Sequence, residues 1–110
     1  MNATKRKRLE KAGWKEVTVQ ELLGLTDEEV AFIDMRLSLA DCVKNRRQKL
    51  GLTQQQVAKR IGSSQARVAK IESADPSVSL DLFFSTLLKL GATCSQIGRV
   101  IGKVSTGHAA

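Results

Sequence analysis

From Leu52 to Glu72 the chain reads LTQQQVAKRIGSSQARVAKIE. Thr53 and Ser64 carry hydroxyl groups that can each cap the start of a short helix, and Gly62 can supply the left-handed residue that ends the first one. The apolar positions that would then face a shared core are Val57, Ala58, Ile61, Val68 and Ile71. The segment therefore predicts two short helices joined by a tight turn.

A long helix is predicted before this pair. From Asp27 the apolar residues recur every three or four positions, and no Gly or Pro occurs until Gly51. The helix can therefore run to about Lys49, with a break near Ser38 as the alternative. Its apolar residues form two stripes, which are Phe32, Met35, Leu39, Val43 and Leu50 on one face and Val30, Ile33, Leu37 and Ala40 on another. One stripe fits the domain core, and the other can be covered either by the N-terminal segment around Trp14 or by a partner protein.

Three more helices are predicted from their first and last residues. The expected cap and stop of each are Thr18 and Gly24, Ser79 and Gly91, and Thr93 and Gly102. The helix that follows Ser64 is expected to end at Asp75-Pro76, because the proline ring lacks an amide hydrogen and restricts the residue before it. With no convincing strand pattern, the sequence predicts an all-α protein.

Charge is distributed unevenly along the chain. The 110 residues carry a formal net charge of +7. Residues 1–15 hold six basic residues and one acid, whereas residues 16–41 hold seven acids and one arginine, a net charge of −6. Residues 42–71 hold eight lysines and arginines and no Asp or Glu. Such a run can neutralise several phosphates and repels none, as binding by counterion release requires, although a solvated helical face is the simpler interpretation of a charged stretch.

The aromatic, cysteine and histidine content limits which partners and which functions the protein can have. The four aromatic residues all lie outside 42–71, which argues against base stacking on single strands and favours duplex DNA. Two cysteines, Cys42 and Cys94, are too few for a disulfide framework or a zinc site. The single histidine, His108, leaves none for an acid–base pair or a metal cluster. We therefore expect a cytoplasmic protein without a cofactor, a membrane-spanning segment or enzymatic activity.

The segment 52–72 resembles the XRE family of Cro/repressor-type regulators. The matching residues are Leu52-Thr53-Gln54, Val57-Ala58, Ile61-Gly62, Ser64, Val68 and Ile71-Glu72. The resemblance covers roughly residues 39–93 and implies a five-helix, repressor-like helix-turn-helix domain. In this family the helix that follows Gly62 enters the major groove of DNA.

A second resemblance, to the HigA-like antitoxins of RelE/HigB-type toxin pairs, extends beyond this domain. It rests on Gly13-Trp14, residues 22–29, Arg46-Arg47 and residues 75–81. It implies a repressor that also neutralises a ribonuclease toxin, with the acidic residues 16–41 as the surface for a basic toxin. A solvated helix that only covers the core is the alternative for these acidic residues.

The two resemblances together imply an organisation of the chain. We expect a flexible basic tail over residues 1–13 and an N-terminal helical extension, the candidate partner-binding segment, over residues 14–38. The XRE-type domain is expected over residues 39–102, followed by a flexible tail over residues 103–110.

The XRE resemblance implies which residues contact DNA. The candidates are Gln54, Ser64, Gln65, Ala66, Arg67 and Lys70. Gln54 and Ser64 fall where the family contacts phosphates, at helix N-termini whose free amides attract anions. Gln65, Ala66 and Lys70 fall where it reads bases, since Gln suits adenine, an alanine methyl suits thymine and Lys suits guanine. Arg67 is expected near the DNA backbone, with a base contact as the alternative. The alternative roles are a helix cap alone for Gln54 and Ser64, and a solvated surface residue for Gln65.

Two further sets of residues receive structural assignments. In this family an arginine at the position of Arg47 pairs with the glutamate at the position of Glu72, which implies a structural ion pair. One recognition helix reads too few base pairs for useful specificity, so we expect a homodimer on paired half-sites. The candidate dimer interface is Ile97, Val100 and Ile101, which share one face of the last helix.

The sequence thus favours a sequence-specific dimeric repressor that is also an antitoxin. Two alternatives stay open. One is a stand-alone XRE-family regulator without a toxin, and the other is a protein-interaction module that has lost DNA binding.

Overall fold

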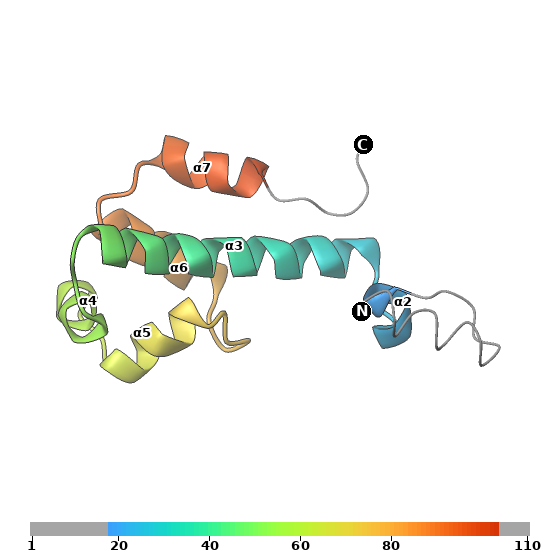
Figure 1. Ribbon diagram of the computed structural model, residues 1–110, viewed down its shortest axis with the longest axis horizontal. Helices are drawn as coiled ribbons and strands as arrows, with labels where there is room; N and C mark the ends of the chain where they lie inside the picture. Colours follow the sequence, from blue (N-terminus) through green and yellow to red (C-terminus); the bar gives the residue numbers. More distant parts are fainter. Residues whose placement is uncertain (1–17, 104–110) are drawn as a thin grey trace, which may run out of the picture. The chain divides into compact units, whose positions relative to one another are not determined.

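The computed structural model describes residues 18–103, and this part of the chain forms six α-helices and no strand (Figure 1). The helices are α2 (Val19–Leu23), α3 (Asp27–Lys49), α4 (Gln54–Ile61), α5 (Gln65–Glu72), α6 (Leu80–Lys89) and α7 (Cys94–Gly102). The all-α fold predicted from the sequence is confirmed. The tails predicted over 1–13 and, except for Lys103, over 103–110 lie outside the described residues, as does Trp14.

Hydroxyl side chains begin all six of these helices. In Thr18, Thr26, Thr53, Ser64, Ser79 and Thr93 the side-chain oxygen accepts the backbone N–H three residues further on, at 3.1 or 3.2 Å. At Thr53 and Thr93 a glutamine side chain also accepts the N–H of the cap residue itself, which completes a capping box. The helix starts expected from the sequence are therefore set by local hydrogen bonds.

The helix α3 is continuous from Asp27 to Lys49. The predicted long helix is therefore present, and the alternative of a break near Ser38 does not occur, because no Gly or Pro interrupts its hydrogen bonds. The described residues belong to two compact units that divide within α3, the first ending at Val30 and the second beginning at Ala31. In the first unit, α2 exposes its apolar side chains, and the Gln20 side chain donates to Asp27 at 2.7 Å.

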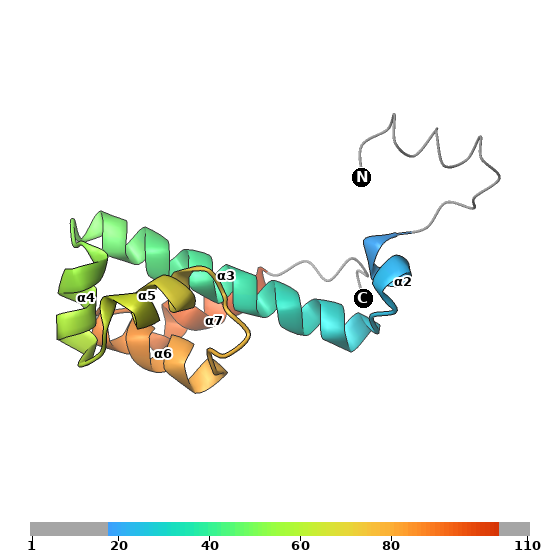
Figure 2. The ribbon, with the colours of Figure 1, turned by 90° about the horizontal axis from the view of Figure 1, so that it is seen from below.

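The second unit holds the hydrophobic core of the described residues. Its buried members are Leu39, Ala40, Val43, Val57, Ala58, Ile61, Val68, Ile71, Val78, Phe83, Leu87, Leu90, Ala92 and Ile97. Every inward position predicted between residues 52 and 72 is among them. Figure 1 shows α7 on one side of α3 and α4 with α5 on the other, and in the view of Figure 2 α5 lies in front of α7. The core thus fixes α5 on the side of α3 opposite to α7.

The helix α5 ends for a different reason from the one predicted from the sequence. The helix ends at Glu72, before Pro76 is reached, and Ala74 takes a left-handed conformation with φ of 56°. The Asp75 N–H donates to the Lys70 carbonyl at 3.0 Å and the Ala74 N–H to the Ile71 carbonyl at 3.2 Å. This pair of bonds closes a helix in a Schellman motif. The motif, with alanine where glycine is usual, therefore stops the helix before the proline can.

Candidate nucleic-acid interface

The turn between α4 and α5 sets the direction of α5. Gly62 has φ of 69°, and its N–H donates to the Lys59 carbonyl at 3.3 Å, while the Ser63 N–H donates to the Ala58 carbonyl at 2.8 Å. Because Val68 is fully buried against the core, the opposite face of α5 meets solvent. The exposed residues on this side are Ser64, Gln65, Ala66, Arg67 and Lys70. Five of the six candidate DNA contacts are therefore brought together on one exposed surface, which we call the α5 face.

A hollow of about 250 Å³ lies beside the α5 face. Ser64, Ala66, Arg67 and Lys70 line one part of it, and Ser77, Val78 and Leu82 line the rest. The hollow thus places the two cations of α5 next to the turn that follows the helix. A groove with two positive side chains at its edge can accept the phosphates of a nucleic acid backbone.

The Gln65 side chain is held by a second glutamine. The Gln55 side-chain amide donates to the Gln65 side-chain oxygen at 3.2 Å, across the turn between α4 and α5. This bond leaves the NH₂ group of Gln65 free to donate and one lone pair of its oxygen free to accept. An amide in that state can make the two-point contact with adenine.

Ser64 and Gln54 have partners inside the protein. The Ser64 hydroxyl oxygen accepts the Arg67 N–H at 3.2 Å, so Ser64 is the N-cap of α5 and keeps its hydroxyl proton for a further acceptor. Gln54 is half-buried, and its side-chain amide donates to Glu72 at 3.3 Å. Gln54 thus lies at the first position of α4 but with its amide bonded to a carboxylate of α5.

Arg47 and Glu72 form an ion pair that joins α3 to α5. The Arg47 Nε atom lies 2.6 Å from one Glu72 oxygen and the Nη2 atom 3.0 Å from the other, while Nη1 donates to the Leu52 carbonyl at 3.0 Å. The hydrogen bond to Glu72 raises the pKa of Arg47. Since the Glu72 side chain is only 5% exposed, its negative charge is neutralised inside the protein and kept away from the α5 face.

The neighbouring Arg46 serves a different contact. Its Nε atom donates to the Leu90 carbonyl at 2.8 Å, which ties α3 to the end of α6. The adjacent arginines therefore fix α3 to two different parts of the core. Both are partly buried, whereas the cations of α5 are exposed.

The candidate dimer residues differ in burial. Ile97 is part of the core, whereas Val100 and Ile101 are half-buried and pack against it. Of the three, Val100 and Ile101 keep surface that a second protomer can contact.

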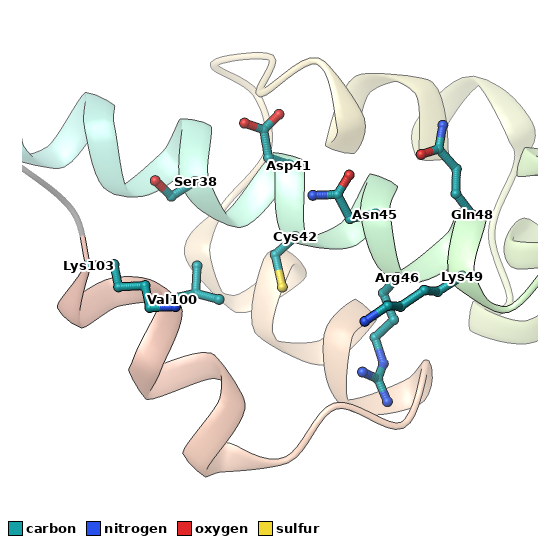
Figure 3. A pocket seen from close by; sticks show the side chains of 9 residues that line it. All are labelled: Ser38, Asp41, Cys42, Asn45, Arg46, Gln48, Lys49, Val100 and Lys103. Atoms are coloured by element: carbon teal, nitrogen blue, oxygen red, sulfur yellow. The ribbon is translucent and has the colours of Figure 1, made fainter.

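A pocket lies between α3 and α7, away from the α5 face (Figure 3). It has a volume of about 840 Å³, and the Cys42 thiol points into it. Burial raises the pKa of that thiol, and the charge of Arg46 opposes the shift. Within residues 18–103 no group of three or more His, Cys, Asp or Glu side chains is gathered to hold a metal ion. No helix in the same range has the length and apolar character needed to cross a bilayer.

Two residues of the interface were not predicted from the sequence. Gln55 follows Gln54 in a run of three glutamines, and which of them faces α5 depends on the rotation of α4 about its axis. Ser77 lies after the helical pair, where the only local signal is the Asp75-Pro76-Ser77 turn pattern.

One comparison with known proteins found a match, to a helix-turn-helix family. Residues 43–91, just under half of the chain, match the model of a helix-turn-helix family. The matched range runs from the second half of α3 through α6 and includes the whole α5 face. This match supports a DNA-binding helix-turn-helix domain of the XRE type. Searches of curated proteins and of solved structures gave no match.

Proposed function

We propose that the protein is a sequence-specific transcriptional repressor of the XRE type that binds duplex DNA as a homodimer. The observation that carries the proposal is the α5 face. It exposes Gln65, Arg67 and Lys70 together, within a range that matches a helix-turn-helix family and inside a run of residues without any carboxylate.

Each part of the α5 face has a separate task in this proposal. Arg67 and Lys70 supply charge, Lys70 with a guanine within reach and Arg67 at the DNA backbone. Gln65 reads adenine with an amide that Gln55 holds in one orientation, and the Ala66 methyl contacts thymine. Ser64 directs its hydroxyl and the amides at the start of α5 to a phosphate.

Gln54 has a more restricted task. Its side chain bonds to Glu72 in the structure, so a phosphate contact at this position uses the backbone amides at the start of α4 or costs that bond. The proposed dimer uses Val100 and Ile101 of α7, with Ile97 supporting them from the core. Two copies then read half-sites about one helical turn apart.

A second function, neutralisation of a RelE/HigB-like ribonuclease toxin, is proposed for the same chain. The observation that favours it is the acidic stretch of residues 16–41, with seven acids and one arginine, on a protein that is otherwise basic. That stretch repels a polyanion such as DNA, whereas it attracts a basic protein. A neighbouring gene that encodes no such toxin would leave the stand-alone regulator as the better account.

DNA binding is tested with Gln65→Ala. Sites are first selected from random duplexes with the wild-type protein, and fluorescence anisotropy then compares a selected site with a scrambled duplex. We expect Gln65→Ala to cost about 1–3 kcal/mol on the selected site and little on the scrambled one. Gln48→Ala, an exposed glutamine on α3 outside the α5 face, serves as the matched control and should change neither.

Two results would contradict the proposal. Equal losses for Gln65→Ala on both duplexes would remove its reading role. Failure to select any site from the random pool would favour a protein-interaction module without DNA binding.

A further inference from the structure

A second hollow lies beside the α5 face, on the side of α4. It has a volume of about 490 Å³ and is lined by Gln55, Gln56, Ala58, Lys59, Ser63 and Gln65. The hollow described above, lined by Arg67, Lys70 and the turn after α5, shares none of these residues. The helix α5 is therefore bordered by two separate hollows, and we call the second one the α4 hollow.

The two hollows lie on opposite flanks of α5. Successive residues of an α-helix are rotated by about 100° around its axis, so Gln65 and Arg67 are separated by about 200°. Gln65 lines the α4 hollow, and Arg67 lines the other one. Ala66, the residue between them, is exposed and Val68 is buried. The exposed side of α5 thus forms a ridge with a hollow along each flank.

A ridge of this shape matches the major groove of a duplex. The groove is about 12 Å wide, which admits one α-helix. Because each side of the groove is bordered by the backbone of a different strand, a helix inserted there meets phosphates on both of its flanks. In the proposed function Arg67 lies at the backbone of one strand, so the α4 hollow faces the other strand.

Lys59 supplies the positive charge of the α4 hollow. It lies four residues after Gln55, one helical turn further along the same side of α4. The Gln55 side chain bonds to Gln65 at 3.2 Å, so this side of α4 is turned toward α5. The Lys59 side chain is exposed, and no carboxylate of residues 18–103 lies within ion-pair distance of it. Its charge is therefore available to an anion at the flank of α5.

The next residue, Arg60, provides a comparison within the same helix. Arg60 is also exposed, but it lines neither hollow. It lies five residues after Gln55, which rotates it by about 140° away from the side of α4 that Gln55 turns toward α5. The two adjacent cations of α4 therefore differ in whether they can reach a duplex that holds α5.

We infer that Lys59 binds a backbone phosphate of duplex DNA, on the strand opposite to the one that Arg67 contacts. The inference rests on the proposed DNA binding and adds to it a contact from α4. Phosphate contacts fix the register and orientation of a protein on the duplex. With a cation on each flank, α5 is held between the two strands while Gln65 and Lys70 reach the bases.

The test measures the salt dependence of DNA binding by the full-length protein, on the selected site and on the scrambled duplex. We plot the logarithm of the association constant against that of salt concentration. We expect Lys59→Ala to reduce the slope by about 0.9 on both duplexes, because a phosphate contact does not depend on sequence. The ratio of the two affinities should change less than twofold. Lys59→Arg keeps the charge and should keep the wild-type slope.

Arg60→Ala is the matched control. It removes one exposed positive charge from the same helix and should leave the slope unchanged. All three variants should keep the wild-type circular dichroism spectrum, since both side chains are exposed.

Ethylation interference on the selected site assigns the strand. The wild-type protein should require unmodified phosphates on both strands of each half-site. Lys59→Ala should lose this requirement at a phosphate of one strand, and Arg67→Ala at a phosphate of the other. Losses on the same strand would overturn the inference.

The outcomes separate the inference from the function on which it rests. If the wild-type protein binds neither duplex, the proposed repressor function and the inference both fail. If it binds and Lys59→Ala keeps the wild-type slope, or Arg60→Ala reduces the slope as much as Lys59→Ala does, the inference alone fails.

Discussion

Asp75 illustrates how single side chains shape the turn after α5. Its Oδ1 atom accepts the Ser77 N–H at 2.9 Å and the Ser77 hydroxyl at 2.6 Å. These two bonds, the hydroxyl first, lower the pKa of the Asp75 carboxyl. The carboxylate therefore holds Ser77, a residue that lines the hollow beside the α5 face, in one orientation.

A pH dependence follows from this lowered pKa. Because the pKa of Asp75 is lower in the folded protein than in the unfolded chain, the carboxylate stabilises the fold above the unfolded value of about 3.9. That contribution is lost as the pH falls through the lower, folded pKa. We expect Ser77→Ala to raise the Asp75 titration midpoint, measured by carboxyl carbon NMR, toward the ordinary value. Ser95→Ala on α7 should leave it unchanged, and an unmoved midpoint in Ser77→Ala would show that the hydroxyl bond is absent in solution.

The residues of the candidate site could be predicted from the sequence only in part. The positions of Gln65, Ala66, Arg67 and Lys70 on one side of α5 follow from the helical period once Val68 is assigned to the core. The partners of Gln54 and Gln65 do not follow, because they depend on side-chain orientation between residues that are 18 and 10 positions apart.

The helix α5 ends at a left-handed residue that has a side chain, Ala74. Within the described part of the chain Ala74 alone combines a positive φ with a Cβ atom. A left-handed conformation is unfavourable for alanine and nearly neutral for glycine.

This difference predicts a stabilising substitution. We expect Ala74→Gly to raise the free energy of unfolding by about 0.5–1 kcal/mol, after allowing for the greater freedom of glycine in the unfolded chain. Ala69→Gly, at an exposed position inside α5, should instead lower it by about 1 kcal/mol. Urea unfolding followed by circular dichroism measures both changes. Two changes of the same sign would mean that Ala74 is not left-handed in solution.

Helix boundaries were the most predictable level of the fold. Hydroxyl caps such as Thr53 and Thr93 act through bonds to residues three positions away, so a short stretch of sequence contains the whole signal. The end of α5 was attributed to Pro76 because nothing in the composition of residues 73–75 indicates a left-handed alanine.

For the whole molecule, the distribution of charge separates two kinds of surface. The α5 face belongs to a run of residues without carboxylates, and the exposed apolar residues at the start of α3 belong to a stretch with seven acids and one arginine. The total charge of +7 conceals this division. The sequence alone showed the two stretches but could not show that Phe32, Ile33 and Leu37 stay exposed, since exposure depends on which helices pack against α3.

The positive surface predicts a salt dependence. We expect the logarithm of the DNA association constant to fall linearly with the logarithm of salt concentration, and Lys70→Ala to reduce the slope by about 0.9 if the side chain neutralises one phosphate. Lys103→Ala, an exposed lysine directly after α7, should leave the slope unchanged. A slope that Lys103→Ala reduces and Lys70→Ala does not would place the DNA on the opposite side of α3.

The bond between Gln55 and Gln65 affects how the DNA-sequence preference of this protein can change during evolution. A replacement at Gln65 alone would strand the amide of Gln55 without its acceptor, and a replacement at Gln55 alone would release Gln65 to rotate. A change of the preferred DNA sequence during evolution would therefore require substitutions at both glutamines. A library designed to change that preference should vary the two codons together.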